Sequence, residues 1–451
     1  MVPSQLNQLC INTLRTLSID AVQKANSGHP GTPMGAAPTA YCLWQGFLRF
    51  DPAVPNWINR DRFVLSAGHA CALLYSMLHL CRVKADSASY SPKDRDERLA
   101  VTLEDLKTFR QAGSRCTGHP EFGWTSGVET TTGPLGQGAA TSVGMAMSER
   151  WLAATYNRPD YDLFRHNVYA LCSDGDMMEG ITSEAASIAG HLKLSNLCWI
   201  YDDNRISIEG STELAFTENV AARYAAYGWQ VVHVDDANDL KLLSDSYQRF
   251  IDTTDCPTLI IVHSHIGFGA PHKQDSSEAH GEPLGVEEVR LAKQFYGCDP
   301  DAQFDVPEGV VEHFSSLFGK RGADAHAEWE TLFAAYRSQY PDLAEQLDHM
   351  QQRDLPPGWD DALPRFTADA KGMATRDASG QVLNAIAANV PWLLGGSADL
   401  APSTKTHLKF EFAGNFQPTG EDPNASYRGR NFHFGVREHA MCAIGSGLSL
   451  S

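Results

Sequence analysis

Short apolar runs alternate with helical patterns between residues 62 and 263, and this alternation limits the possible folds more than any other feature. Each run ends in a polar or glycine-bearing turn, and a helical pattern follows most of them. The runs occupy residues 62–66, 167–172, 197–201, 229–234 and 258–263. Strands that alternate with helices predict an α/β fold, with a mostly parallel sheet covered by helices on both faces.

The chain has 451 residues, which is too long for one hydrophobic core. Composition changes at 351–376, where three prolines stand among charged residues, as is typical of a crossing between domains. We therefore expect a first domain at 1–350, a linker at 351–376 and a second α/β domain at 377–451. A strand is expected at 392–395, and a final helical pattern still runs where the chain stops, so we expect the second domain to be incomplete.

Charge and cysteine content limit the possible partners. The formal net charge is −19, which opposes binding to nucleic acid or to an anionic membrane. No apolar run approaches the ~20 residues of a membrane span, and no signal peptide is recognisable. The ten cysteines are scattered singly without C-x-x-C spacing, so a zinc site is not expected and the reducing cytoplasm is the expected compartment.

Two polar motifs follow neighbouring apolar runs. Asp174 lies in Ser-Asp-Gly-Asp after one run, and Asn204 follows the next run. The carboxyl ends of parallel strands meet at one sheet edge, where α/β proteins bind ligands. A carboxylate and an amide oxygen at that edge can hold a hard divalent cation, and Gly175 would let a phosphate approach the backbone. An ordinary turn at each strand end explains the pattern about equally well.

Glycine turns and histidines form a second group of signals. Thr132 to Gly138 is a glycine-rich entry into a helix, as in many anion sites, although a purely structural turn is the simpler explanation. Histidines flank glycine in four loops, at His29, His69, His119 and His280. Any one of them reads as a surface or capped histidine, but four in similar settings indicate a polar cleft that handles protons.

The sequence resembles the transketolase family of thiamine-diphosphate-dependent enzymes over nearly the whole chain. The resembling segments are DAVQKANSGHPGTPMG, NRDRFVLSAGHA, GHPE, VETTTGPLGQG, SDGDMMEG, YDDNRISIEG, IGFGAPHK, AHGEPLG, GSADLAPS and FGVREHAM. The resemblance implies a reversible transfer of a two-carbon ketol group from a ketose phosphate to an aldose phosphate, through a carbanion of bound thiamine diphosphate. It also makes 1–350 the diphosphate-binding domain and 377–451 the pyrimidine-binding domain.

The resemblance assigns cofactor and metal roles to residues of the first domain. The residues that would hold Mg²⁺ or Ca²⁺ are Asp174, Asn204 and, through its backbone carbonyl, Ile206. Those that would contact thiamine diphosphate are His69, Gly133, Pro134, Leu135, Gly175, Asn204 and His280.

Catalytic and substrate roles are implied in the same way. Glu438 would hydrogen-bond the aminopyrimidine of the cofactor and activate it. Three histidines would handle substrate protons and bind substrate, namely His29, His119 and His280. Arg376 and Ser403 would hold the distal phosphate of the sugar. The family places the cofactor between the first domain of one subunit and the second domain of its partner, so a homodimer is implied.

The sequence departs from the family pattern in several places. Ser173 stands where glycine is usual before the metal-binding aspartate, Asp203 where an asparagine is common, and Ala67 where asparagine is frequent. Family members also continue beyond Ser451. Four hypotheses stay open. The first is an active transketolase, either completed by a separately encoded C-terminal half or represented here by a piece. The others are an inactive fragment that keeps cofactor affinity, a dihydroxyacetone synthase-like ketol transferase, and a nucleotide-binding α/β protein.

Overall fold

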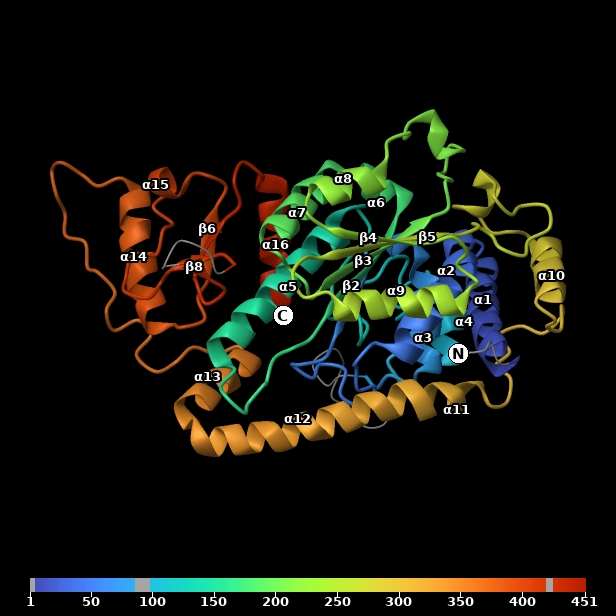
Figure 1. Ribbon diagram of the computed structural model, residues 1–451, viewed down its shortest axis with the longest axis horizontal. Helices are drawn as coiled ribbons and strands as arrows, with labels where there is room; N and C mark the ends of the chain where they lie inside the picture. Colours follow the sequence, from blue (N-terminus) through green and yellow to red (C-terminus); the bar gives the residue numbers. More distant parts are fainter. Residues whose placement is uncertain (1–4, 86–97, 419–424) are drawn as a thin grey trace.

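A five-stranded parallel sheet forms the centre of the computed structural model, which describes residues 5–85, 98–418 and 425–451 (Figure 1). Its strands follow the spatial order β1-β2-β3-β5-β4. They are β1 (Arg62–Leu65), β2 (Val168–Ser173), β3 (Leu197–Asp203), β4 (Gln230–Val234) and β5 (Thr258–His263). Each strand coincides with one of the predicted apolar runs, and the all-parallel pairing confirms the predicted fold class.

Alternate residues of these strands enter two separate cores, one on each face of the sheet. Tyr169 and Leu171 of β2 belong to one core, whereas Val168 and Ala170 belong to the other. Because both faces are buried, the strands read as continuous apolar runs rather than as alternating patterns. The first core is covered by α1 (Gln5–Ala25), α2 (Gly31–Gly46), α3 (Cys71–Leu80) and α9 (Leu240–Asp252). The second is covered mainly by α5 (Gln137–Tyr156), α7 (Gly180–His191) and α8 (Val220–Ala226).

Shorter and peripheral elements complete the first part of the chain. The short helices are η1 (Gly68–Ala70), α4 (Leu103–Lys107), α6 (Asp174–Met178), η2 (Thr212–Leu214) and η3 (Ser277–Ala279). The peripheral ones are α10 (Val286–Phe295), α11 (Val310–Phe314), η4 (Ser315–Gly319), α12 (Lys320–Gln339) and α13 (Pro341–Gln352). No helix among the described residues is both long and apolar enough to cross a membrane.

A second, smaller parallel sheet follows residues 353–374, a described stretch that contains no helix or strand. Its spatial order is β6-β9-β7-β8. Its strands are β6 (Gly395–Ser397), β7 (Asn415–Phe416), β8 (Ala425–Ser426) and β9 (Asn431–His433), accompanied by α14 (Thr375–Asn389) and α15 (Ala401–Thr404).

The first strand of this sheet begins later than predicted. The prediction of a strand at 392–395 is wrong in its start, since β6 begins at Gly395 and ends at Ser397. The physical reason is close packing, because a Cβ at Gly396 would collide with the main chain and side chain of Phe432 on β9. Glycine, a residue that usually weakens strands, is therefore what this pairing needs.

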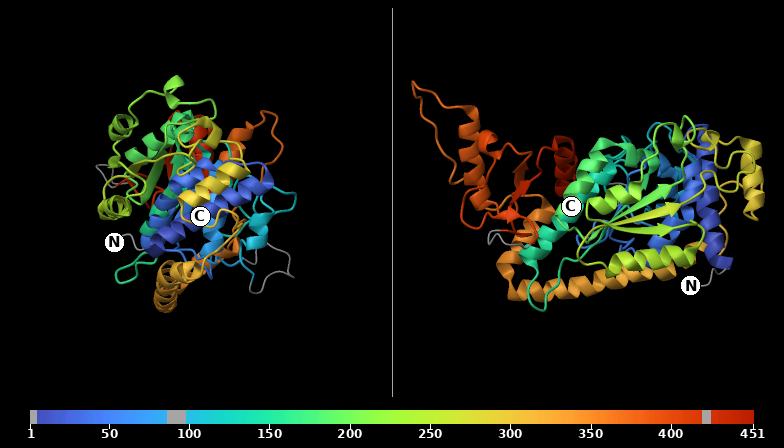
Figure 2. Two further views of the ribbon diagram at one scale, coloured as in Figure 1. Left: turned by 90° about the vertical axis from the view of Figure 1, so that its right-hand side faces the viewer. Right: turned by 45° about the horizontal axis from the view of Figure 1, so that its top comes forward.

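Helix α16 (Glu438–Leu450) returns from the second sheet and packs on α5 of the first (Figure 1). A Cβ at Gly144 of α5 or at Gly447 of α16 would collide with a main-chain oxygen of the facing helix. Ile444 of α16 is fully buried in the same core as β2. The two parts of the chain thus share a core, while α14 and α15 lie at the opposite end of the molecule from α1 and α2 (Figure 2).

Candidate active site

The carboxyl ends of β2 and β3 lie side by side and carry the predicted cation ligands. Ser173, the last residue of β2, pairs in register with Asp202 of β3. Ser173 also caps α6, since its hydroxyl accepts from the Asp176 amide and the Asp176 carboxylate accepts from the Ser173 amide. This capping box starts a helix directly after the strand and fixes Asp174 in its first turn, at the sheet edge.

Asp174 and Asn204 meet at this edge. The Arg205 amide, next to Asn204 in the chain, donates to Asp174 Oδ2 at 3.1 Å, and the Tyr201 hydroxyl donates to Asp174 Oδ1 at 2.6 Å. The Asn204 side-chain amide donates to Asp202 at 2.8 Å, while its oxygen accepts from the Ile206 amide at 3.1 Å. Hydrogen bonds therefore connect the segment that carries Asp174 with the segment that carries Asn204 and Ile206.

The charge at this edge suits a divalent cation. Asp174 is 3% exposed, and burial, with the nearby Asp202 and Asp203, raises its pKa to about 7. Burial likewise raises the pKa of Asp202 to about 6. Buried carboxylates crowded in this way are costly unless a cation offsets their charge. Within the described ranges, no three His, Cys, Asp or Glu side chains are arranged to hold a metal; the predicted set instead combines one carboxylate, one amide oxygen and one main-chain carbonyl, which are ligands that Mg²⁺ accepts.

The carboxyl ends of β2 and β3, with the proposed ligands Asp174, Asn204 and Ile206, are called the cation edge below. Tyr201 orients the carboxylate of Asp174, so replacing Tyr201 tests this edge. Because the family resemblance makes Asp174 a metal ligand beside thiamine diphosphate, we expect Tyr201→Phe to weaken Mg²⁺-dependent binding of that cofactor by about 10-fold, the scale of a lost hydrogen bond behind such a ligand. Tyr247→Phe is the matched control, because its buried hydroxyl donates to Thr39 O at 3.1 Å in the other core. Titration calorimetry checks the result, and equal affinities in the two variants would contradict the role of Tyr201.

The glycine turn before α5 packs against the cation edge. A Cβ at Gly175 would lie only 2.5 Å from Leu135 Cδ1, so the turn rests directly on the start of α6. A Cβ at Gly68 would lie 3.0 Å from the Gly133 amide nitrogen, which brings the loop after β1 to the same place. Gly133 in turn lies against the His119 ring. The loops after β1 and β2 and the turn before α5 thus line one continuous surface.

Asp176 joins these loops through contacts that no sequence pattern predicted. It is fully buried and accepts from Ser66 Oγ at 2.6 Å, from the Gly136 amide at 2.7 Å and from Ser173 Oγ at 2.9 Å. It therefore ties the ends of β1 and β2 to the start of α5. The Ser-x-x-Asp spacing of the capping box could have predicted the local role of Asp176. Nothing in the sequence indicated its long-range hydrogen bonds to Ser66 and Gly136.

The four predicted histidines gather beside the cation edge. The His29 ring centroid lies 5.0 Å from that of His69 and 5.9 Å from that of His280, and the His69 and His280 centroids are 5.3 Å apart. His119 lies close enough to influence both His29 and His69 electrostatically. The Ile206 main chain lies close enough to His280 to raise its pKa, against a larger lowering by burial, and so places His280 beside the cation edge. In the described part of the chain, His69 Nε2 and His280 Nδ1 are buried without a hydrogen-bond partner, so this cluster can accept bonds from a ligand.

The proton of His29 can be placed from its neighbours. The Arg110 guanidinium approaches His29 Nδ1 at 3.5 Å and can only donate. Nδ1 is therefore the acceptor, and the proton of the neutral ring lies on Nε2. Burial, with His280, Arg110 and His119, lowers the pKa of His29 to about 4. The His29 ring stays neutral near pH 7 and offers an N–H donor. No sequence pattern indicated that Arg110 would fix this tautomer.

This lowered pKa predicts a loss of stability in acid. The unfolded imidazole takes up a proton near pH 6.5 and the folded one only near pH 4, so His29 destabilises the fold as pH falls between these values. We expect His29→Asn to lose less stability than the native chain between pH 7 and pH 5. Urea unfolding at pH 7 and pH 5 measures the change in the free energy of unfolding. Replacing the exposed His233 on β4 with asparagine is the control. An identical acid loss in His29→Asn and native protein would contradict the assignment.

Three predicted residues lie apart from this cluster within one chain. Arg376 on α14, Ser403 on α15 and Glu438 at the start of α16 are all exposed. The neighbours of Glu438 contact α7, since Glu184 accepts from the Ala440 amide and Ser187 Oγ from Arg437. The carboxyl ends of the central strands point toward α1 and α2, away from α14 and α15 (Figure 2). A single chain therefore does not bring these three side chains to the histidines.

Comparison with known families identifies both parts of the chain. Residues 6–356 match the family model described as transketolase, thiamine diphosphate binding domain. Residues 371–451 match the model described as transketolase, pyrimidine binding domain. The transketolase of Geobacillus stearothermophilus is 51% identical over 445 residues, which cover 99% of this chain and 63% of that protein. Transketolase 1 of Saccharomyces cerevisiae is 45% identical, with 99% and 62% covered.

Solved structures give the same result. A transketolase from Pichia stipitis in complex with sedoheptulose 7-phosphate is similar with a TM-score of 0.91 at 44% identity, over 99% of this chain and 63% of that one. Another from the same organism, in complex with xylulose 5-phosphate, has a TM-score of 0.92 at 44% identity and the same coverage. The chain thus spans a little less than two thirds of the length of these relatives.

Proposed function

This chain belongs to the transketolase family, and on that premise we propose that it supplies the thiamine diphosphate and divalent-cation site of an enzyme that transfers two-carbon ketol groups between sugar phosphates. The observation that carries the proposal is the junction of the cation edge with the histidine cluster. Asp174, Asn204 and Ile206 meet at that edge, and the Ile206 main chain lies close enough to His280 to act on its pKa. A phosphorylated cofactor held at the edge would place its far end among the histidines.

The residues present fit the cofactor and its metal. The buried carboxylate of Asp174 has a raised pKa, and a divalent cation, proposed as Mg²⁺ or Ca²⁺, would neutralise it. His69 Nε2 and His280 Nδ1 are two buried atoms without hydrogen-bond partners in the described ranges, and the turn at Gly133, Pro134 and Leu135 lies beside Gly68 and the His119 ring. Bound thiamine diphosphate supplies a carbon nucleophile and an electron sink for cleavage of a carbon–carbon bond.

The side chains of this chain would position the substrate and move its protons. His29 presents Nε2–H as a donor to a developing alkoxide, and Arg110 holds that tautomer. His280 and His119, both with lowered pKa values because of burial, stay neutral and can accept hydroxyl protons. Arg376 and Ser403 are proposed to bind the distal phosphate through charge-assisted hydrogen bonds.

We propose that the site is completed by a second copy of the chain in a homodimer. Glu438, Arg376 and Ser403 are exposed and lie apart from the histidines of their own chain. A partner subunit could bring its own three side chains to the cofactor, as the family resemblance implies.

We propose domain boundaries at 1–350 and 377–451, with 351–376 as the linker between the two domains. The ten free thiols suit a reducing compartment such as the cytoplasm.

The proposed activity is tested by ketol transfer from xylulose 5-phosphate to ribose 5-phosphate. The chain is assayed alone and mixed with a polypeptide that corresponds to the C-terminal remainder of the relatives. Transfer in either assay supports the proposal, and transfer only in the mixture supports a divided enzyme. Tight cofactor binding with no transfer in both assays would favour a non-catalytic fragment, and faster reaction with formaldehyde as acceptor would favour dihydroxyacetone synthase-like specificity.

A further inference from the structure

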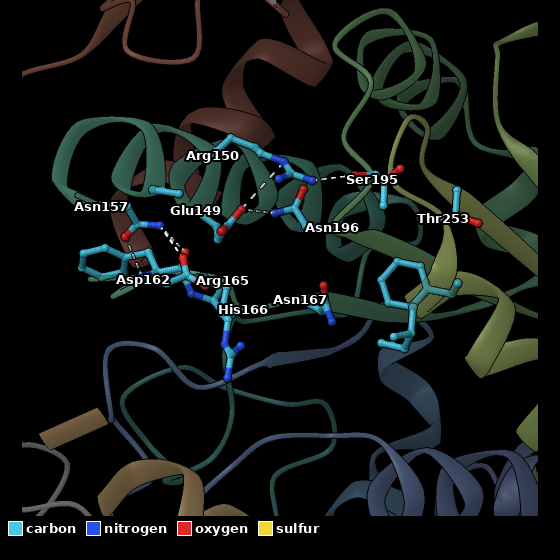
Figure 3. Close-up of a pocket in the computed structure, with 15 residues that line it drawn as sticks. Glu149, Arg150, Asn157, Asp162, Arg165, His166, Asn167, Ser195, Asn196 and Thr253 are labelled. Carbon is cyan, nitrogen blue, oxygen red and sulfur yellow. Dashed lines mark hydrogen bonds and ion pairs between the residues drawn. The ribbon is translucent and has the colours of Figure 1, made fainter. Parts of the chain in front are cut away.

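A separate polar cavity opens at the other edge of the central sheet, where the strands begin (Figure 3). It is bordered by the second half of α5, by the segments leading into β2 and β3, and by the end of α9. Its volume is about 350 Å³, enough for roughly ten water molecules at about 30 Å³ each and within the range of small-molecule sites. The cation edge and the histidines lie at the carboxyl ends of the strands, so this cavity does not belong to them.

Two buried acceptors line this cavity. His166 is fully buried, and its Nδ1 lies 3.4 Å from Asn59 Oδ1, an atom that can only accept. His166 Nδ1 therefore carries the proton, and Nε2 is a bare acceptor with no partner among the described residues. Asn196 donates to Glu149 Oε2 at 2.8 Å and to Ala146 O at 3.0 Å, but in the same described ranges its buried Oδ1 has no partner. Buried acceptors of this kind need a hydrogen-bond donor.

Two arginines, Arg150 and Arg165, line the cavity together with two carboxylates, Glu149 and Asp162. The Asp162 carboxylate already accepts from the Asn157 side-chain amide at 2.8 Å. Burial and four arginines, with Arg62 foremost, hold the pKa of His166 well below its ordinary value. Arg150 lines the cavity and donates to Ser195 Oγ at 2.6 Å, and the exposed Arg165 lies at its rim. Burial raises the pKa of Glu149 to about 7, which lessens its repulsion of an anion.

From these contacts we propose that the cavity binds a small hydroxylated anion, with its charged group at Arg150 and Arg165 and its hydroxyl groups on His166 and Asn196. A phosphorylated and a carboxylated polyol share this chemistry. Arginine pairs well with either anion, and hydroxyl groups are the donors that the two buried acceptors require. Because the cavity and the histidine cluster lie at opposite sheet edges, a ligand here would leave access to the proposed catalytic cleft open.

Titration calorimetry tests the proposal on chain saturated with thiamine diphosphate and Mg²⁺. The probes are glycerol 1-phosphate and glycerate, with inorganic phosphate and glycerol as fragments. One of the two hydroxylated anions should bind at one per chain and about tenfold more tightly than either fragment. Absence of saturable binding, or inorganic phosphate binding as tightly as the best probe, would overturn the proposal.

Variants assign the binding to this cavity. Arg150→Gln and the exposed Arg165→Gln should each weaken it by about fivefold or more, whereas Arg290→Gln on α10 makes the same change of charge elsewhere and should have no effect. His69→Ala alters the histidine cluster, so binding that survives in it is independent of the proposed catalytic function. Loss of binding in His69→Ala with full binding in Arg165→Gln would place the probe in the catalytic cleft and refute the second site.

Discussion

Replacing Asp174 with alanine is expected to abolish metal-dependent binding of thiamine diphosphate, with affinity falling by about 100-fold or more. Asp174 supplies the one carboxylate of the proposed ligand set, and Tyr201 and the Arg205 amide hold both of its oxygens in place. Without it, the cation has no charged anchor beside the diphosphate. Calorimetric titration of the cofactor with and without Mg²⁺ measures the effect.

The variant's own stability separates loss of a ligand from misfolding. Burial raises the pKa of Asp174 to about 7, above the unfolded value near 4, so its folded form favours the proton and its charge costs stability above pH 7. The metal-free Asp174→Ala chain should therefore melt at the same or a higher temperature than native chain at pH 8. Asp203→Asn removes a neighbouring charge at the same edge and is the control; normal cofactor affinity in Asp174→Ala would refute the metal assignment.

Glu438→Gln is expected to lower turnover of the complete enzyme by about 10²–10⁴-fold, the range for a lost acid–base group, while sparing cofactor affinity. Glu438 is the first residue of α16, and its side chain is exposed. A neutral amide accepts a proton far less readily than a carboxylate. Glu411→Gln, an exposed glutamate of the same domain, is the control, and unchanged turnover in Glu438→Gln would remove this residue from the mechanism.

Mixed dimers test whether Glu438 acts across the subunit interface. An Asp174→Ala chain paired with a Glu438→Gln chain retains one intact site if Glu438 serves the partner's cofactor. It retains none if Glu438 serves its own chain. Random mixing of the two inactive variants in equal amounts should then restore about a quarter of native activity, because about half of the dimers are mixed and each carries one working site of two. Absence of any recovery would contradict action across the interface.

The central sheet was largely predictable because its strands are buried on both faces. Runs such as 197–201 and 259–262 are apolar throughout, and their order along the chain leaves few parallel arrangements. The juxtaposition of Asp174 and Asn204 followed from the same rule, since both come directly after neighbouring strands. In the second sheet, β7 and β8 have two residues each and gave no periodic signal.

Local pattern could not reveal contacts made over long distances in the chain. Asp176 accepts hydrogen bonds from Ser66 and from the Gly136 amide, and Arg110 donates to His29. The partners in these bonds lie 40 to 110 residues apart in the sequence. The cavity at His166 combines segments that carry no recognisable motif. Glycine in particular misled the strand prediction at 392–395, because the close approach of β6 to Phe432 is a property of the packed sheet and not of the segment.

The proposed active site depends on a cation bound between Asp174 and Asn204 that anchors a diphosphate beside the histidines. Titration of the purified chain with thiamine diphosphate, in the presence and absence of Mg²⁺ and against ATP with Mg²⁺, tests this most directly. We predict saturable binding of thiamine diphosphate at one per chain that requires the metal and exceeds the affinity for ATP. Tighter binding of ATP, or cofactor binding that ignores the metal, would contradict it.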